Sequence, residues 1–274
     1  GITLNHTPHG IKVMPYQAGR NWNKGGICDS VELLLAPRAR VEDVFVRGDW
    51  KSGQVRVQAD VRNDAGHDVQ SKLDLVVAPA RSGSTVASAR LERTLAPGLT
   101  RVETTLQVPG HRLWELNDPQ LYRLSLRVAE EGSASRDERS LRFGFRDFRF
   151  ERGYFRLNGR RIYLRCSHTT NCCPVGLEMP HDPDLLRRDL LNVKVMGFNA
   201  IRFIDGVAKR YQLDLCDEIG LMVYEESYAA WLMENSPQMP QRYDRSVGSM
   251  VRRDRNHACV TIWGLLNETH EGPV

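Results

Sequence analysis

The sequence lacks the features that mark several broad classes of protein. No apolar run approaches the roughly 18 residues that a membrane-spanning helix needs, so a membrane partner is not expected. Lysine and arginine total 38 against 34 aspartates and glutamates, a net charge of +4 over 274 residues. This excess is too small and too evenly spread to indicate a nucleic-acid partner. With 41% hydrophobic and 26% charged residues, the composition is that of a folded globular chain of about two domains.

Several common site motifs are also missing. Without G-x-G-x-x-G or G-x-x-x-x-G-K-[ST], a dinucleotide or P-loop site has little support. Without G-x-S-x-G or H-E-x-x-H, a serine hydrolase or zincin site lacks its motif. The six cysteines form no C-x-x-C pair, and their spacing to the histidines matches no zinc pattern. We therefore expect no metal or other cofactor, and this cysteine usage favours a reducing compartment such as the cytoplasm.

Neither end of the sequence has the features of a natural terminus. Gly1 stands where a methionine is expected, and no basic and apolar leader follows it. The last three residues, 272–274, come soon after a predicted strand. We therefore expect a piece of a longer protein, which leaves a signal peptide open.

Residues 37–143 predict a β-sandwich. Short segments of alternating apolar and polar residues recur there at the spacing of strands separated by turns, most clearly in residues 54–61. Further candidate strands are residues 41–46, 73–78, 101–108 and 121–128. About seven strands fit this span. Residues 1–36 are too few for a domain and are expected to be the tail of a preceding one.

After Gly144 the pattern changes, and strands alternate with helices as in βαβ units. The expected strands are residues 161–165, 199–203, 221–225 and 261–265, and the expected helices are residues 182–196, 209–219 and 243–254. Asp182 is placed as the N-cap of the first helix, Pro183 at its first position and Gly197 at its end. About four βα units fit a doubly wound sheet or a (β/α)₈ barrel, and the missing dinucleotide motif favours a partial barrel over residues 144–274.

Polar residues gather at the ends of these predicted parallel strands. His168 follows the first strand, Arg202 ends the second, Glu226 ends the third, and Asn267 with Glu268 follows the fourth. In a barrel, the carboxyl ends of the strands form the mouth where active sites are built. Carboxylates that converge with hydrogen-bonding partners are what glycoside hydrolysis requires.

Each of these residues, taken alone, also fits a structural role. Arg202 can pair with a barrel carboxylate, His168 can be a hydrogen-bonded loop histidine, and the Asn-Glu dipeptide can begin a loop. Glu225 and Glu226 are adjacent on a strand, so their side chains point to opposite faces. We assign Glu226 to the barrel interior. The basic pairs at residues 187–188 and 252–253 are expected to lie on solvated helix faces.

Segments with a characteristic order and spacing run through most of the chain. They are residues 113–114, 117–122, 143–146, 155–165, 197–202, 215–221, 253–257 and 262–268. Together they resemble glycoside hydrolase family 2, which contains β-galactosidases, β-glucuronidases and β-mannosidases. The resemblance implies the end of an N-terminal jelly-roll sugar-binding domain in residues 1–36, an immunoglobulin-like β-sandwich in 37–143, and the first half of a catalytic TIM (β/α)₈ barrel in 144–274.

The resemblance also implies a mechanism. Glu268 is expected to be the general acid/base of a retaining glycosidase, with a second carboxylate about 5 to 5.5 Å away. Asn267 is expected to hold the sugar 2-hydroxyl, and Arg202 to support the site. Glu226 and His168 are further candidates for substrate binding.

Aromatic residues near the third predicted strand are a further candidate for sugar contact. Trp231, with Tyr224 and Tyr228, is expected to offer a stacking platform, although Tyr224 fits core packing equally well. The expected partner is a carbohydrate substrate, and the formation of a homo-oligomer stays open.

The departures from the family pattern limit these expectations. The family nucleophile, a Glu on the seventh barrel strand, lies beyond this sequence, so the chain alone is not expected to turn over. The Glu and His that bind Mg in some members do not follow Glu226, so neither Mg nor Na is expected. Residues 166–173 and 203–206 replace family segments, which leaves the sugar unknown.

Three hypotheses follow. The leading one is a retaining exo-β-glycosidase that hydrolyses terminal β-linked sugars, of which this chain is a fragment. The others are a non-catalytic carbohydrate-binding relative and an inactive half-barrel fragment. The retained pair Asn267 and Glu268 favours the enzyme, and a Glu at the end of the seventh strand would distinguish it from the binding protein.

Overall fold

The computed structural model describes residues 12–13, 16–17, 31–169, 182–204, 206–227 and 238–268. Contacts divide the chain into two compact units, which are described separately. The sandwich unit comprises Leu33–Tyr163 and Asn256–Ala258. The barrel unit comprises Gly1–Glu32, Leu164–Arg255 and Cys259–Val274.

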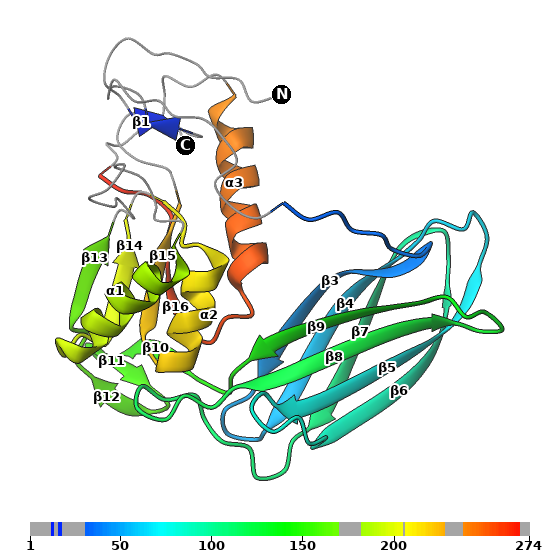
Figure 1. Ribbon diagram of the computed structural model, residues 1–274, viewed down its shortest axis with the longest axis horizontal. Helices are drawn as coiled ribbons and strands as arrows, with labels where there is room; N and C mark the ends of the chain where they lie inside the picture. Colours follow the sequence, from blue (N-terminus) through cyan, green and yellow to red (C-terminus); the bar gives the residue numbers. More distant parts are fainter. Residues whose placement is uncertain are drawn as a thin grey trace. The chain divides into compact units, whose positions relative to one another are not determined.

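The sandwich unit contains two antiparallel sheets (Figure 1). One sheet has the order β3-β4-β7, formed by β3 (Ala39–Gly48), β4 (Gln54–Asn63) and β7 (Gly98–Gln107). The other has the order β6-β5-β8-β9, formed by β5 (Val69–Pro79), β6 (Ala87–Leu95), β8 (Tyr122–Glu130) and β9 (Arg136–Phe143). These strands confirm the predicted immunoglobulin-like β-sandwich.

Alternating burial explains why the sandwich strands form where they do. On β4, buried residues alternate with exposed ones, and Val55 and Val61 have no exposed surface. Facing residues of the second sheet, such as Leu73 and Leu126, complete the same core. The edge strands β6 and β9 alternate weakly because much of their surface faces water. That weak alternation is why neither strand was singled out from the sequence.

A three-stranded antiparallel sheet follows the sandwich strands and corrects one prediction. It contains β10 (Phe148–Glu151), β11 (Tyr154–Leu157) and β12 (Arg160–Ile162). The prediction of a first barrel strand over residues 161–165 is wrong, because this segment begins inside β12. Asn158 and Gly159 adopt φ values of 50° and 77°, as in the tight turns that join hairpin strands. The alternation of apolar residues that suggested a parallel strand therefore belongs to this antiparallel hairpin.

The barrel unit contains a parallel sheet of four strands in the order β13-β14-β15-β16 (Figure 1). The strands are β13 (Cys166–Thr169), β14 (Ala200–Phe203), β15 (Met222–Glu226) and β16 (Val260–Gly264). The intervening helices are α1 (Pro183–Val195), α2 (Arg210–Ile219) and α3 (Met239–Asp254). The alternation of strands and helices confirms the predicted partial barrel. In the same unit, β1 (Lys12–Val13) pairs with β2 (Tyr16–Gln17).

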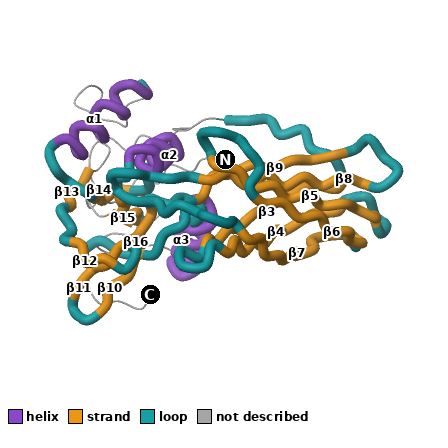
Figure 2. Tube along the Cα trace, turned by 90° about the horizontal axis from the view of Figure 1, so that it is seen from below, coloured by secondary structure: helices purple, strands orange, loops and turns teal. Residues whose placement is uncertain are grey.

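Local signals determine where α1 begins and ends and where α2 ends. The Asp182 carboxylate accepts the backbone N–H of Asp184 at 2.9 Å, with Pro183 at the start of α1. Gly197 follows the helix with φ 90°, and Gly220 ends α2 with φ 70°. Figure 2 shows the helices in purple. Within the described residues, none of them is long and apolar enough to cross a bilayer.

Candidate active site

The parallel register of the barrel unit brings the predicted polar residues to one edge of the sheet. His168 on β13 lies opposite Arg202 on β14, which lies opposite Tyr224 on β15. Glu226, at the end of β15, lies opposite Gly264 on β16. Because all four strands run the same way, their carboxyl ends meet along this edge.

Arg202 joins the ends of three chain segments. Its Nε donates to Glu226 Oε2 at 2.8 Å, and its Nη2 donates to the same oxygen. Nη2 also donates to Asn267 Oδ1 at 2.9 Å. The Glu226 side chain has no exposed surface, and Asn267 is 5% exposed. The guanidinium lies 4.9 Å from the centre of the Tyr224 ring, a cation–π distance. The structure thus brings together three residues predicted from the sequence.

Gly264 makes room for this cluster and was not identified from the sequence. A Cβ atom at this position would lie 2.8 Å from Glu226 Cγ and closer still to the Tyr224 ring. Any larger residue would displace one of these two side chains. The glycine stands in the apolar segment before Asn267, and a glycine inside a strand is a known sign of close packing against a neighbour.

The segment that carries Asn267 and Glu268 is tied to the end of β15 through Ser227. The Ser227 N–H donates to Gly264 O at 3.0 Å, and its hydroxyl donates to Leu265 O at 2.6 Å. Asn267 is buried, whereas Glu268 is exposed. Glu268 has a φ of 49°, a left-handed conformation that costs on the order of 1–3 kcal/mol for a residue other than glycine and is often found at functional sites.

His168, a further predicted site residue, does not join the cluster. His168 lies within β13 rather than after it, and its side chain is exposed. Within the part of the chain that the structure describes, the hydrogen bonds of the cluster join Arg202 to Glu226 and Asn267 without His168. Trp231 and Tyr228, the other predicted aromatic contact residues, lie outside the described residues.

Glu225 points to the opposite face of β15 from Glu226, as predicted from their adjacency. Its Oε1 accepts the N–H of Ala208 at 2.8 Å and lies 3.5 Å from Arg253 Nη2. Burial and the nearby Asp254 carboxylate raise the pKa of Glu225 to about 8. Arg253 is therefore not on a solvated helix face, and this prediction is wrong. A pair of arginines in sequence does not reveal which one turns inward.

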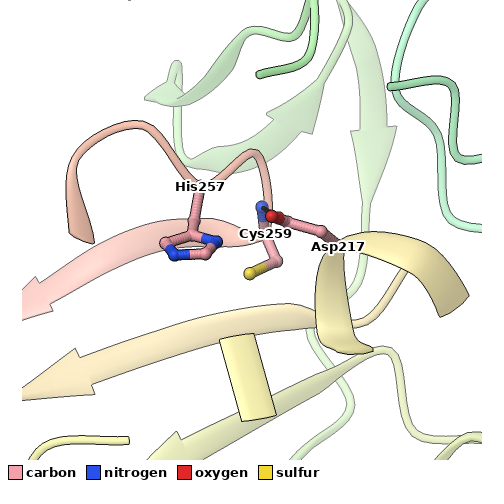
Figure 3. Close-up of side chains that lie close together, drawn as sticks. All are labelled: Asp217, His257 and Cys259. Carbon is pink, nitrogen blue, oxygen red and sulfur yellow. Dashed lines mark hydrogen bonds between the residues drawn. The ribbon is translucent and has the colours of Figure 1, made fainter. Parts of the chain in front are cut away.

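The Asp217 carboxylate and the Cys259 thiol lie within 4.8 Å of each other in this unit. Asp217 on α2 accepts the N–H of Cys259 at 2.8 Å (Figure 3). The Cys259 thiol donates to Leu213 O at 3.4 Å, and burial raises its pKa. Both groups are therefore already engaged in hydrogen bonds within the fold.

Two family models match consecutive parts of the chain. The model described as "Glycosyl hydrolases family 2" matches residues 39–146. The model described as "Glycosyl hydrolases family 2, TIM barrel domain" matches residues 148–273. The second match includes all the residues of the Arg202 cluster.

Individual proteins are also similar to the chain. A β-galactosidase of Erwinia tasmaniensis is 27% identical over 269 residues, which cover 92% of this chain and 26% of that protein. A putative β-glucuronidase of Formosa agariphila is 33% identical over 175 residues, which cover 60% of this chain and 16% of that protein. The crystal structure of a glycosyl hydrolase family 2 member from Bacteroides cellulosilyticus matches with a TM-score of 0.77 and 26% identity, covering 86% of this chain and 33% of that one. The chain thus spans about a quarter of the length of the curated β-galactosidases that it matches.

Proposed function

Because the chain belongs to the glycosyl hydrolases of family 2, we propose that the protein containing it is a retaining exo-β-glycosidase acting on terminal β-linked sugars. The observation that carries the proposal is the Arg202 side chain, which binds both Glu226 and Asn267. Through this contact Asn267 lies at the edge where the parallel strands have their carboxyl ends, and the exposed Glu268 follows it in the chain. The proteins that it resembles include β-galactosidases and a putative β-glucuronidase, so the sugar stays open.

Glu268 is the proposed general acid/base. Its carboxyl group protonates the glycosidic oxygen as the bond to the departing group breaks. The resulting carboxylate then removes a proton from the water that hydrolyses the glycosyl-enzyme. The exposed side chain of Glu268, next to the buried Asn267, suits this role, because a general acid/base must reach both the substrate and incoming water.

Asn267 is the proposed ligand of the sugar 2-hydroxyl. An arginine has only donors, so its contact at 2.9 Å requires the Asn267 oxygen to face Arg202. The amide nitrogen is thereby left as the donor toward the sugar. Hydrogen bonds to the 2-hydroxyl strengthen in the transition state of these reactions. Glu226 keeps the Arg202 guanidinium in place through the hydrogen bonds to Oε2.

The remaining catalytic parts are proposed to come from outside this sequence. A retaining mechanism needs a nucleophilic carboxylate about 5 to 5.5 Å from the acid/base, and we place it on a later strand of the completed barrel. His168, whose side chain is exposed on β13, and Trp231 are proposed sugar contacts. The alternative is a carbohydrate-binding relative that keeps the architecture without turnover.

The test uses the full-length protein and a panel of aryl β-glycosides: galactoside, glucuronide, mannoside and glucosaminide. We expect one of them to be cleaved, and we expect Glu268→Gln to reduce kcat by at least about 100-fold. Glu218→Gln, an exposed glutamate on α2, is the matched control and should retain activity. Sugar binding without turnover of any glycoside would overturn the proposal in favour of the binding protein.

A further inference from the structure

A buried ionic cluster lies on the opposite face of β15 from the candidate active site, and the proposed chemistry does not use it. Glu225 Oε1 accepts the N–H of Ala208 at 2.8 Å. Arg253 Nη2, from α3, donates to Ala208 O at 2.7 Å and lies 3.5 Å from Glu225 Oε1. Glu225 and Arg253 therefore hold both backbone polar groups of Ala208, in the segment between β14 and α2.

One cation in this cluster serves two carboxyl groups. Arg253 Nε and Nη2 each donate to one oxygen of Asp254 at 2.7 Å. Neither Glu225 nor Asp254 has exposed side-chain surface. Glu225 also interacts electrostatically with the thiols of Cys216 on α2 and Cys259 before β16, and burial raises the pKa of both, so they are neutral. Beyond these thiols lie the Asp217 carboxylate and the Lys194 ammonium group. Among Glu225, Arg253 and Asp254, the charges balance when Glu225 carries a proton, in agreement with its raised pKa of about 8.

Simple packing does not explain a cluster of this kind. Well-packed apolar side chains often stabilise a core as much as a buried ion pair does. Charged and hydrogen-bonded groups differ from apolar ones because their interactions are directional, so each hydrogen bond fixes the position of a particular atom. Here the bonds reach β15 through Glu225 and the segment after β14 through Ala208. Strand β15 carries Glu226, and strand β14, which precedes the segment with Ala208, carries Arg202.

We infer that Glu225 and Arg253 are positioning residues for the proposed glycosidase: by holding Ala208, they keep the ends of β14 and β15 in the alignment that joins Arg202 to Glu226. The inference rests on the proposed function, and neither residue touches the sugar. Glu225 acts through its neighbour Glu226, whose side chain leaves the strand on the active-site face. Arg253 acts through Glu225 and Ala208.

The first test is the pH dependence of kcat/KM for the dinitrophenyl glycoside of the sugar that the full-length protein cleaves. This leaving group departs without a proton, so ionisation of the acid/base does not limit the measured step. Above pH 8, ionised Glu225 repels Asp254 and loosens the cluster, and we expect wild-type activity to fall by about tenfold or more. Glu225→Gln cannot ionise and keeps an acceptor for Ala208, so it should retain activity without this alkaline loss.

The second test separates positioning from stability. Arg253→Lys keeps the charge but lacks the planar fork that reaches Ala208 and Asp254 together. We expect kcat to fall by about tenfold with KM changed by less than about twofold. The reason is that a misplaced Asn267 weakens its proposed hydrogen bond to the sugar 2-hydroxyl, which is strongest in the transition state. Arg252→Lys, at an exposed position of the same helix, is the matched control and should match the wild type.

The outcomes distinguish this inference from the proposed function. Turnover with the pH profiles of wild type and Glu225→Gln superimposed would overturn the inference alone. So would an Arg253→Lys variant with wild-type kcat. Turnover of no glycoside by the wild-type protein would overturn the proposed function and this inference together.

Discussion

Arg202 Nε lies 2.8 Å from Glu226 Oε2 on the neighbouring strand, where the Glu226 side chain has no contact with solvent. The two residues are 24 positions apart, and helix α2 lies between them in the chain. A buried carboxylate is stable only when it is paired and hydrogen-bonded. Arg202 supplies that pairing, and through Nη2 it also holds Asn267.

Arg202→Lys should reduce kcat/KM for the cleaved glycoside by about 100-fold, because a single ammonium group cannot serve Glu226 and Asn267 in the same geometry. The measurement is steady-state kinetics of the full-length protein. Arg210→Lys, at the exposed first residue of α2, is the control and should leave both constants unchanged. Equal activity in the two variants would show that the Arg202 contacts are not used.

Gly264→Ala should reduce activity and stability together. Its Cβ would lie 2.8 Å from Glu226 Cγ, and overpacking of this kind costs about 1–3 kcal/mol. Gly248→Ala on α3 is the matched control, because nothing lies within 4 Å of the added Cβ and alanine favours a helix by about 0.5–1 kcal/mol over glycine. Chemical unfolding and kinetics measure both effects. An active and undiminished Gly264→Ala variant would contradict the packing described above.

Ser227→Ala removes the hydroxyl that donates to Leu265 O at 2.6 Å. We expect a stability loss of about 1 kcal/mol and a several-fold decrease in kcat, because the segment carrying Asn267 and Glu268 loses an anchor. Thr261→Val is the comparison, since it removes a hydroxyl that donates to Val223 O at 3.3 Å within the same sheet. It should lose similar stability and keep its kcat. If kcat falls equally in both, the effect of Ser227 is one of stability alone.

Glu225 should make stability depend on pH in a direction opposite to that of a salt-bridged carboxylate. Its pKa rises from 4.5 to about 8 on folding, so between these values the folded state binds more protons than the unfolded state. The contribution of Glu225 to the free energy of unfolding is therefore fully present below pH 4.5 and is lost as pH rises toward 8.

The measurement is thermal unfolding of the wild type and Glu225→Gln across this pH range. The amide does not titrate, so the variant should gain stability relative to the wild type as pH increases, with the difference levelling off above pH 8. A constant difference would mean that Glu225 does not bind the extra proton.

Much of the fold could be predicted from local patterns. The β4 alternation and the Asp182 and Gly197 signals of α1 each depend on residues near in sequence. Burial on one face and capping at one end are local requirements, so one segment is enough to recognise them. The same reasoning failed at residues 161–165, because the Asn158-Gly159 turn makes β12 the antiparallel partner of β11 rather than a strand of the parallel sheet.

The sequence predicted the polar residues of the candidate site but not the residues that pack around them. Polar residues at strand ends indicated Arg202, Glu226, Asn267 and Glu268, since parallel strands bring their carboxyl ends to one edge. Nothing local indicated that Gly264 must leave room for Glu226, or that Arg253 turns inward while Arg252 stays exposed. Those facts depend on which helix packs against which strand.

The sequence alone determined the family, the succession of a β-sandwich and alternating parallel strands and helices, and the types of residue at the strand ends, because these follow from motif order, periodicity and the parallel direction of the strands. Only the tertiary structure decided which partners each charge has. Glu225 and Glu226 are identical in type and adjacent, yet one faces Ala208 and Arg253 and the other faces Arg202. Their environments differ because a strand sends successive side chains to opposite faces, and only packing determines what each face meets.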